Sequence, residues 1–171
     1  MLSVKSKRLL FIVTGLIIAL IINSCKKNGQ SPIQALFTGG TWQLASVTAT
    51  NYVGNQLIST DTLNAKCDSI QDFTFYTNNT CTYTNFDCMA QTPPAASWSL
   101  SANQLFLRAN VVCKDTVAKD NSMPFSNASI QNLGQFSLVL LTGDIQPNYS
   151  LTQHRRIIQW GFVRQKVNGV D

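Results

Sequence analysis

The sequence contains no glutamate, and its single histidine is His154. A hydrolase that works with paired carboxylates would have to use two aspartates, and no two stand in a suggestive setting. His154 has no carboxylate or cysteine beside it, and no G-x-S-x-G motif is present. We therefore expect no catalytic residues and no enzyme activity. The enzymatic alternative is a Ser-His-Asp hydrolase, which requires the fold to bring His154 near an aspartate and a serine.

Metal and nucleic-acid sites lack their usual signals as well. No C-x-x-C pair accompanies the lone histidine, so a zinc site is a poor explanation for the cysteines. No cluster of Lys and Arg with interleaved aromatic residues occurs in the body of the chain. We therefore expect no metal, no cofactor and no nucleic-acid partner.

The N-terminal segment carries the strongest signal in the sequence. Three basic residues precede an apolar run over 9–22, which is shorter than the roughly 20 residues that span a bilayer as a helix. This layout is typical of a secretory signal peptide, and an uncleaved anchor is the alternative. The letters INSC at 22–25 resemble the lipobox of bacterial lipoproteins. The resemblance implies cleavage after residue 24 and a thioether-linked diacylglycerol on Cys25, which with further acyl chains anchors the protein to a membrane.

Removing the predicted leader lowers the net charge, and the sequence then separates into three segments. The whole sequence has 13 basic and 8 acidic residues, and the leader holds three of the basic ones, which leaves a net charge near +2. We predict a signal peptide over 1–24, a lipidated N-terminus and tether over 25–35, and one domain over 36–171. No acidic run of the kind associated with surface export follows Cys25. The expected location is therefore the bacterial outer membrane, facing the periplasm, with the cell surface as the alternative.

Four cysteines remain once Cys25 carries lipid, and an even number in an exported chain indicates disulfides. The letters FTFYTNNTCTYTNF predict two strands around a turn at 78–79, where asparagine tolerates a left-handed backbone. Cys67 precedes the first strand and Cys88 follows the second, so folding the hairpin brings them together. This predicts the pairs Cys67–Cys88 and Cys81–Cys113.

Short runs rich in β-branched and aromatic residues recur through the body, separated by Gly, Asn and Asp. Alternation places Trp42 and Leu44 on one side of the first run, and Phe73 and Phe75 on one face of another. Helical periodicity is weak, except for one short turn of helix expected at 32–37. Several short strands with turns between them indicate an all-β sandwich or barrel. The expected strands lie within 41–50, 70–76, 98–107, 136–141 and 156–165.

These runs resemble a known family. GGTWQL at 39–44 contains the G-x-W signature that begins the first strand of a lipocalin. The block KCDSIQDFTFYTNNTCTYTNFDC, then SWSLSANQLFL, ASIQNLGQFSLVLL and the closing WGFVRQ, is similar to the bacterial lipocalin-like domain lipoproteins. The resemblance covers roughly 36–166 and implies an antiparallel up-and-down β-barrel of about eight strands. One departure is Cys81 in place of an aromatic residue, which supports the additional disulfide to Cys113.

The resemblance also singles out side chains. In lipocalins a tryptophan caps the closed end of the barrel beneath an arginine from the last strand, and the matching residues here are Trp42 and Arg164. The barrel interior is the candidate ligand site, although the same side chains could simply fill the core, and Trp98 fits a core role better. The candidate inward residues are Phe73, Phe75, Phe86, Trp98, Leu100, Leu105 and Leu107.

Three further positions match a short acceptor pattern. Thr62, Ser69 and Thr116 each follow an aspartate and precede an apolar residue, which resembles an O-glycosylation site used for exported proteins in one group of Gram-negative bacteria. Aspartate followed by Ser or Thr is also an ordinary turn signal.

Two non-catalytic functions follow from the sequence. The first is binding of a small hydrophobic ligand inside the barrel of a lipid-anchored envelope protein. The alternative is a structural or interaction lipoprotein with a filled barrel, whose outer face or 114–126 loop binds an envelope protein or a glycan.

Overall fold

The structure, a computed structural model, describes residues 30–63, 67–90, 96–114 and 121–165. The predicted signal peptide, lipid site at Cys25 and acceptor Thr116 lie outside these residues, as does much of the 114–126 loop. A compact unit begins at Pro32 with helix α2, Pro32–Thr38, which confirms the short helix expected there. Proline suits the first position of a helix because its missing N–H is not needed there. Within the described part, no helix is long and apolar enough to cross a membrane.

The rest of the unit is antiparallel β-structure, as predicted. Nine strands form one sheet in the order β11-β10-β9-β6-β5-β4-β3-β1-β2, and an additional β11–β1 pairing closes eight of them into a ring. The eight ring strands follow chain order, with β2 paired outside the ring and with β7 and β8 forming a separate two-stranded sheet. The strands are β1 Thr41–Val53, β2 Gln56–Thr62, β3 Asp72–Phe75, β4 Thr80–Thr84, β5 Ala96–Leu100, β6 Phe106–Ala109, β7 Cys113–Lys114, β8 Asn121–Ser122, β9 Ala128–Leu133, β10 Ser137–Gly143 and β11 His154–Arg164.

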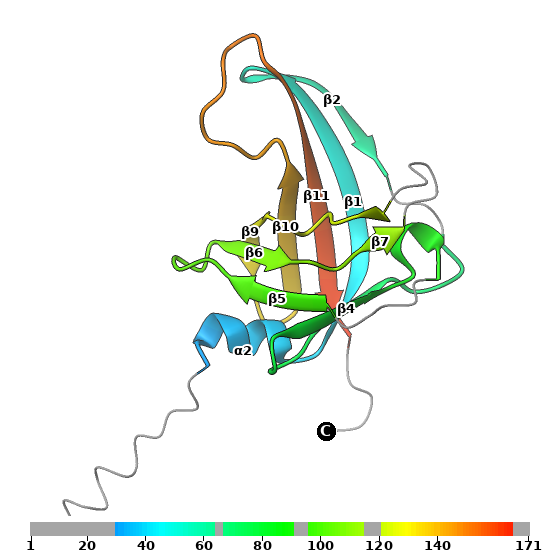
Figure 1. Cartoon of the computed structure of the whole chain (residues 1–171). Helices are drawn as coiled ribbons and strands as arrows, with labels where there is room; N and C mark the ends of the chain where they lie inside the picture. The colour runs from blue at the N-terminus through cyan, green and yellow to red at the C-terminus, as the bar shows by residue number, and fades with distance from the viewer. Residues whose placement is uncertain (1–29, 64–66, 91–95, 115–120, 166–171) are drawn as a thin grey trace, which may run out of the picture. The chain divides into compact units, whose positions relative to one another are not determined.

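Strand β1 closes the ring because it is long enough to have different neighbours along one edge. That edge pairs with β3 over 41–43 and with β2 over 48–53, whereas the other edge pairs with β11 along its length. The β1–β11 register shifts between Leu44 and Ser46, where a Cβ on Gly161 would lie 2.4 Å from the Ser46 hydroxyl oxygen. A glycine in β11 therefore permits the close approach at this bulge. Figure 1 shows α2 at one end of the ring and the β1–β2 hairpin extending at the other.

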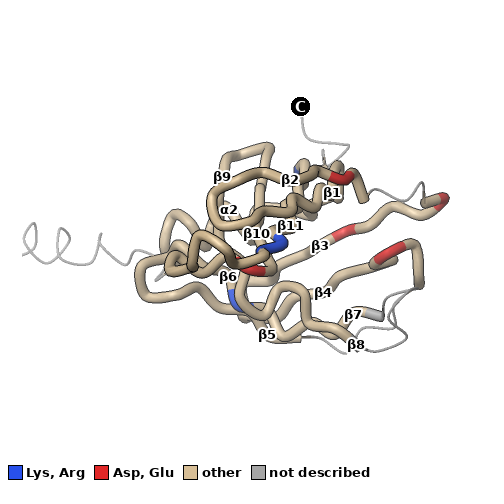
Figure 2. Tube along the Cα trace, turned by 90° about the horizontal axis from the view of Figure 1, so that it is seen from above, with Lys and Arg blue, Asp and Glu red and all other residues tan. Residues whose placement is uncertain are grey.

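Alternation along the strands separates the interior from the solvent. In β3 and β4 the buried positions are Phe73, Phe75, Cys81 and Tyr83, with less buried residues between them. Charged side chains are spread along the described trace, and Figure 2 shows no broad patch of Lys and Arg on it. The interior is therefore apolar and largely aromatic.

The hairpin prediction is confirmed in its turn and in its disulfide. Asn79 has a φ of 63°, a left-handed conformation that asparagine adopts more readily than most residues. The β3–β4 ladder runs from Asp72↔Thr84 to Phe75↔Cys81. Cys67 and Cys88, beyond the two ends, form a disulfide with a Cα–Cα distance of 5.1 Å.

The predicted Cys81–Cys113 disulfide is wrong, because the structure shows both residues as buried free thiols. The Cys81 thiol donates a weak hydrogen bond to the Ser97 carbonyl oxygen at 3.8 Å. Burial raises the pKa of each thiol to about 12, and the proximity of Cys81 contributes to the shift of Cys113. Disulfide formation needs a thiolate, and this environment disfavours one.

Leu105 is a second correction. It was expected to point inward with Leu107, yet 56% of its surface is exposed. Gln104 has a left-handed φ of 58°, and β6 begins only at Phe106. Leu105 therefore lies in the β5–β6 turn, where strand alternation does not apply. Strand β2 and the short pair β7–β8 were not predicted.

A loop over 144–153 is fastened to the β1–β2 hairpin. The Tyr149 hydroxyl donates a hydrogen bond to Asn55 Oδ1 at 2.6 Å, and the Gly54 N–H donates to the Gln153 carbonyl oxygen at 2.9 Å. The Arg155 guanidinium carbon lies 3.4 Å from the centroid of the Tyr149 ring and 5.4 Å from that of Tyr52. Cation–π contacts thus connect the loop to β1 and β11.

Candidate functional site

Helix α2 and the Trp42–Arg164 pair occupy one end of the ring. The Arg164 guanidinium carbon lies 4.4 Å from the centroid of the Trp42 ring, in the cross-strand pair Trp42↔Arg164. Arg164 also donates hydrogen bonds to the carbonyl oxygens of Leu36 and Gly39, and the Trp42 indole N–H donates to the Phe37 carbonyl oxygen at 3.0 Å. Burial lowers the pKa of the guanidinium, which remains a cation. The predicted pair is in contact and ties α2 to the ring.

Next to this pair the interior is filled by aromatic rings. The centroid of Phe73 lies 4.1 Å from that of Phe75 and 4.8 Å from that of Phe125, and Phe37 packs edge-on against Phe75 at 4.9 Å. Trp98 is 3% exposed and packs 5.2 Å from Phe75. Contacts at these distances leave no room for a ligand here.

A cavity of about 650 Å³ lies beside this core. Of the seven candidate inward residues, only Phe86 lines this cavity; Phe73, Phe75, Trp98 and Leu107 are buried in the core, Leu100 packs against it, and Leu105 is exposed. The lining comes from β1, β11, the segment that precedes β3, the η1 turn (Phe86–Cys88) and the region around β8. It comprises Gln43, Leu44, Val47, Leu63, Cys67, Asp68, Ser69, Ile70, Gln71, Phe86, Asp87, Ser122, Pro124, Arg156, Ile158 and Trp160.

The apolar wall of the cavity is built on two paired strands. Leu44 and Val47 come from β1, and Ile158 and Trp160 come from β11. The Trp160 indole N–H donates a hydrogen bond to the Thr142 hydroxyl at 2.8 Å, which satisfies the one polar atom of the ring and fixes its orientation. The Phe86 ring lies 5.7 Å from Trp160, centroid to centroid. Both rings therefore form one aromatic part of the lining.

A polar network supports the other wall, and Gln71 is its centre. Its side-chain oxygen accepts hydrogen bonds from the Tyr83 hydroxyl at 3.3 Å and from the Asp87 backbone N–H at 3.2 Å. Its amide nitrogen lies 3.3 Å from the Cys67 sulfur. The Cys67–Cys88 disulfide and Gln71 together hold the 67–71 segment in position, although this segment has no regular secondary structure.

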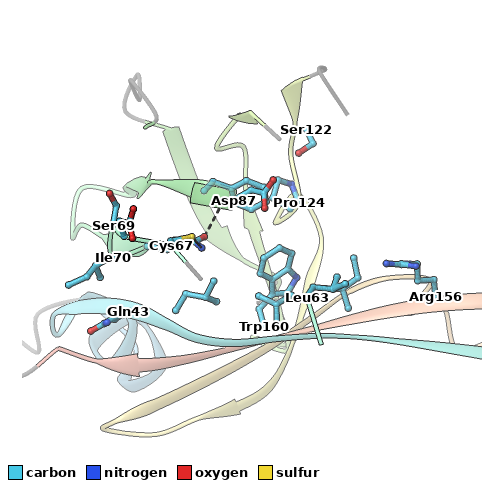
Figure 3. A pocket seen from close by; sticks show the side chains of 16 residues that line it. Gln43, Leu63, Cys67, Ser69, Ile70, Asp87, Ser122, Pro124, Arg156 and Trp160 are labelled. Atoms are coloured by element: carbon cyan, nitrogen blue, oxygen red, sulfur yellow. Dashed lines mark hydrogen bonds between the residues drawn. The ribbon is translucent and has the colours of Figure 1, made fainter. Parts of the chain in front are cut away.

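Charged side chains lie on the cavity lining at separate places. Figure 3 shows Arg156 at one end, beyond Trp160, and Gln43, Ser69 and Ile70 at the other, with Asp87 between these ends. Asp68 also lines the cavity. The arrangement is an apolar central region flanked by polar groups, which suits an amphipathic molecule.

Of the remaining predicted sites among the described residues, one lies on the cavity lining and the others lie outside it. His154 is exposed at the start of β11 and does not line the cavity, and no hydrogen bond joins its ring to an Asp or Ser in the described ranges. In the same ranges no group of three His, Cys, Asp or Glu side chains could hold a metal ion. The acceptors Thr62 and Ser69 are exposed, and Ser69 lies on the cavity lining.

Part of the cavity wall could be predicted from the sequence. Residues 156, 158, 160 and 162 alternate along one predicted strand, so the inward position of Trp160 follows once Phe162 is placed in the core. The contributions of 67–71 and 122–124 carry no such signal, because the first segment is irregular and the second begins at the end of the two-residue strand β8. No protein-family model, curated protein or solved structure shows a significant match to the chain.

Proposed function

We propose that this chain is a lipid-anchored, non-catalytic lipocalin-like protein of the bacterial outer membrane, facing the periplasm, and that it binds a small hydrophobic ligand. Eight strands in chain order around a closed ring support reading the sheet as an up-and-down barrel. The Trp42–Arg164 contact beneath an N-terminal helix supports the lipocalin resemblance. The lipobox-like INSC at 22–25 supports the anchor.

The cavity is the observation that carries the binding function. Its volume of about 650 Å³ falls within the range of about 300–1,000 Å³ that is usual for small-molecule sites. Leu44, Val47, Ile158, Phe86 and Trp160 give it an apolar centre. Because aromatic rings fill the core around Phe73 and Phe75, a ligand would occupy this cavity, which extends from Gln43 at one end to Arg156 at the other.

Strand β2 favours the alternative, an interaction lipoprotein. Among the described strands it pairs with β1 alone, and its Leu57 and Ile58 are 57% and 56% exposed. An unpaired edge with apolar side chains is a place where another chain can add a strand. In that function the cavity would be incidental and would bind no small apolar molecule.

Calorimetric titration with unbranched primary alcohols of increasing length distinguishes the two functions. The full chain is used with Cys25→Ser, so that no acyl chain of its own competes. Burial of each added methylene contributes about 0.8 kcal/mol, so affinity should rise roughly fourfold per carbon until the cavity is full. A series in which no alcohol binds would eliminate the ligand-binding function.

A filled-cavity variant and a matched surface variant locate the binding. Ile158→Trp places a large ring inside the cavity, whereas Val163→Trp makes a comparable change on the same strand at a position that is 45% exposed. Alcohol binding should be lost in the first and unchanged in the second. Equal binding by both would place the ligand elsewhere.

A further inference from the structure

The basic side chain on the cavity lining is Arg156, and it differs from the other two arginines of β11. Arg155 stacks on Tyr149, and Arg164 stacks on Trp42 and donates to backbone carbonyls. The Arg156 backbone N–H is held by Asp144 Oδ2 at 2.9 Å. Its guanidinium makes no ion pair or hydrogen bond with the described part of the chain, and the side chain is exposed. A fixed backbone therefore presents at the cavity a guanidinium that no described residue pairs with.

The residues that follow Arg156 continue the same lining. Arg156, Ile158 and Trp160 all line the cavity, as alternate residues of one strand should. At roughly 3.3 Å per residue, the backbone rises about 13 Å from the charged end to the tryptophan. A molecule lying along β11 would therefore meet a cation first and an apolar surface along its remaining length.

The acidic side chains Asp68 and Asp87, on the other wall of the cavity, favour a cation over an anion. Asp87 is next to Phe86 and is positioned through the hydrogen bond from its backbone N–H to Gln71, and Asp68 follows the disulfide residue Cys67. Figure 3 shows Asp87 well separated from Arg156 across the cavity. An anion near Asp68 or Asp87 would be repelled, whereas at Arg156 the attraction of the guanidinium acts beside the Asp144 carboxylate, which accepts the hydrogen bond from the Arg156 backbone N–H.

We infer that the ligand is an amphiphile with an anionic headgroup, which pairs with Arg156 while its alkyl chain lies along Ile158 and Trp160 toward Phe86. The inference rests on the proposed ligand-binding function and adds the class and orientation of the ligand. A guanidinium can donate two parallel hydrogen bonds to a carboxylate or to a phosphate, so both headgroups belong to this class.

Four probes of equal chain length test the charge: dodecanoate, dodecyl phosphate, 1-dodecanol and dodecylammonium. They are titrated at pH 7.5 and low salt, below their aggregation concentrations, into the full chain with Cys25→Ser. At least one anion should bind about tenfold more tightly than the alcohol, and the cation should bind more weakly than the alcohol. The stronger anion identifies the headgroup chemistry, and added salt should reduce its advantage.

Variants assign the effect to Arg156. Arg156→Gln should reduce the advantage of the anion over the alcohol to less than about twofold, and Arg156→Lys should retain a preference. Arg108→Gln removes the same charge from an exposed position on β6 and should change nothing. Because the Arg156 guanidinium makes no hydrogen bond or ion pair with the described residues, the glutamine variant should keep the wild-type melting temperature.

The outcomes separate this inference from the function on which it rests. If the alcohol and the anions bind equally in the parent chain, or if Arg156→Gln keeps the preference, the ligand-binding function stands and the role of Arg156 is wrong. Tightest binding of dodecylammonium would assign the headgroup to the aspartates instead. If none of the four probes binds, the proposed function itself fails.

Discussion

At the scale of single residues, Arg155, Arg156 and Arg164 show how position on one strand decides what a side chain does. All three belong to β11. Arg155 meets two tyrosine rings, Arg164 meets Trp42 and the end of α2, and Arg156 meets the cavity. Two of these guanidinium groups therefore contact the rest of the fold, and the third lies on the cavity lining.

Arg164→Ala should destabilise the whole ring. The substitution removes a cation–π contact, worth about 0.5–2 kcal/mol, and hydrogen bonds from a charged donor to Leu36 and Gly39, worth about 1.5–3 kcal/mol where they are well formed. Because these terms are not additive, we expect a loss of about 2–4 kcal/mol in the free energy of unfolding, measured by urea denaturation.

Two further variants control this measurement. Arg164→Lys keeps the positive charge but cannot reproduce the planar fork, so its stability should lie between those of the parent and the alanine variant. Arg108→Ala changes an exposed arginine on β6 and should shift stability by less than about 0.5 kcal/mol. An alanine variant at position 164 with the parent's urea midpoint would show that the pair contributes nothing to stability.

At the scale of elements, regular strands were predictable and the pieces between them were not. The hairpin around Asn79 and its Cys67–Cys88 disulfide follow from alternation, a turn residue and the distance between two cysteines along the chain. Leu105 was misplaced because a left-handed Gln104 moves the strand boundary by one residue. The cavity was missed because much of its wall is irregular chain, positioned by contacts such as those of Gln71 that no periodicity encodes.

Tyr149→Ala should loosen the 144–153 loop while leaving the ring intact. The variant loses the hydrogen bond to Asn55 and the contact with Arg155, which together stabilise the closed loop by about 1–2 kcal/mol. Amide exchange at Gly54 and Gln153, whose N–H groups bond within this region, should accelerate by about 5–30-fold. Hydrogen–deuterium exchange with peptide resolution measures this change.

Tyr149→Phe is the matched variant for the loop. It keeps the ring beside Arg155 and loses only the hydroxyl, so the acceleration should be smaller than in the alanine variant. The global free energy of unfolding should change by less than about 1 kcal/mol in both. Exchange that accelerates equally throughout β1 and β11 would contradict a local role.

At the scale of the whole molecule, the interior combines a dry aromatic region with a cavity. The closed, sequential strand order and the apolar alternation agreed with what the sequence predicted. The division of the interior into a packed region and a cavity was not predicted. The same aromatic residues can fill a core or line an open site, and only the distances between their rings distinguish the two arrangements. The dry region also encloses three ionisable side chains, Cys81, Tyr83 and Cys113, which are fully buried.

These buried groups predict a loss of global stability at alkaline pH. Burial raises the pKa of Cys81 and of Cys113 from 9.0 to about 12, and it raises the pKa of the Tyr83 hydroxyl well above its usual range. Below pH 9 all three are protonated in both the folded and the unfolded chain, so their contribution to stability is fully present. Between pH 9 and about 12 the unfolded thiols ionise first, so stability falls as the pH rises.

Urea denaturation of the oxidised protein between pH 7 and pH 10 measures this fall, which should reach about 3 kcal/mol at pH 10 relative to pH 8. The double variant Cys81→Ala, Cys113→Ala should be less stable at pH 7, because it loses buried side chains, yet its stability should fall less toward pH 10. In the parent chain at pH 8, alkylation of these two thiols should be slow until denaturant is added, because the thiolate is the reactive species. If stability falls equally with pH in the parent chain and in the double variant, the two thiols do not ionise preferentially in the unfolded state. Rapid alkylation of the folded protein would show that the two thiols are accessible.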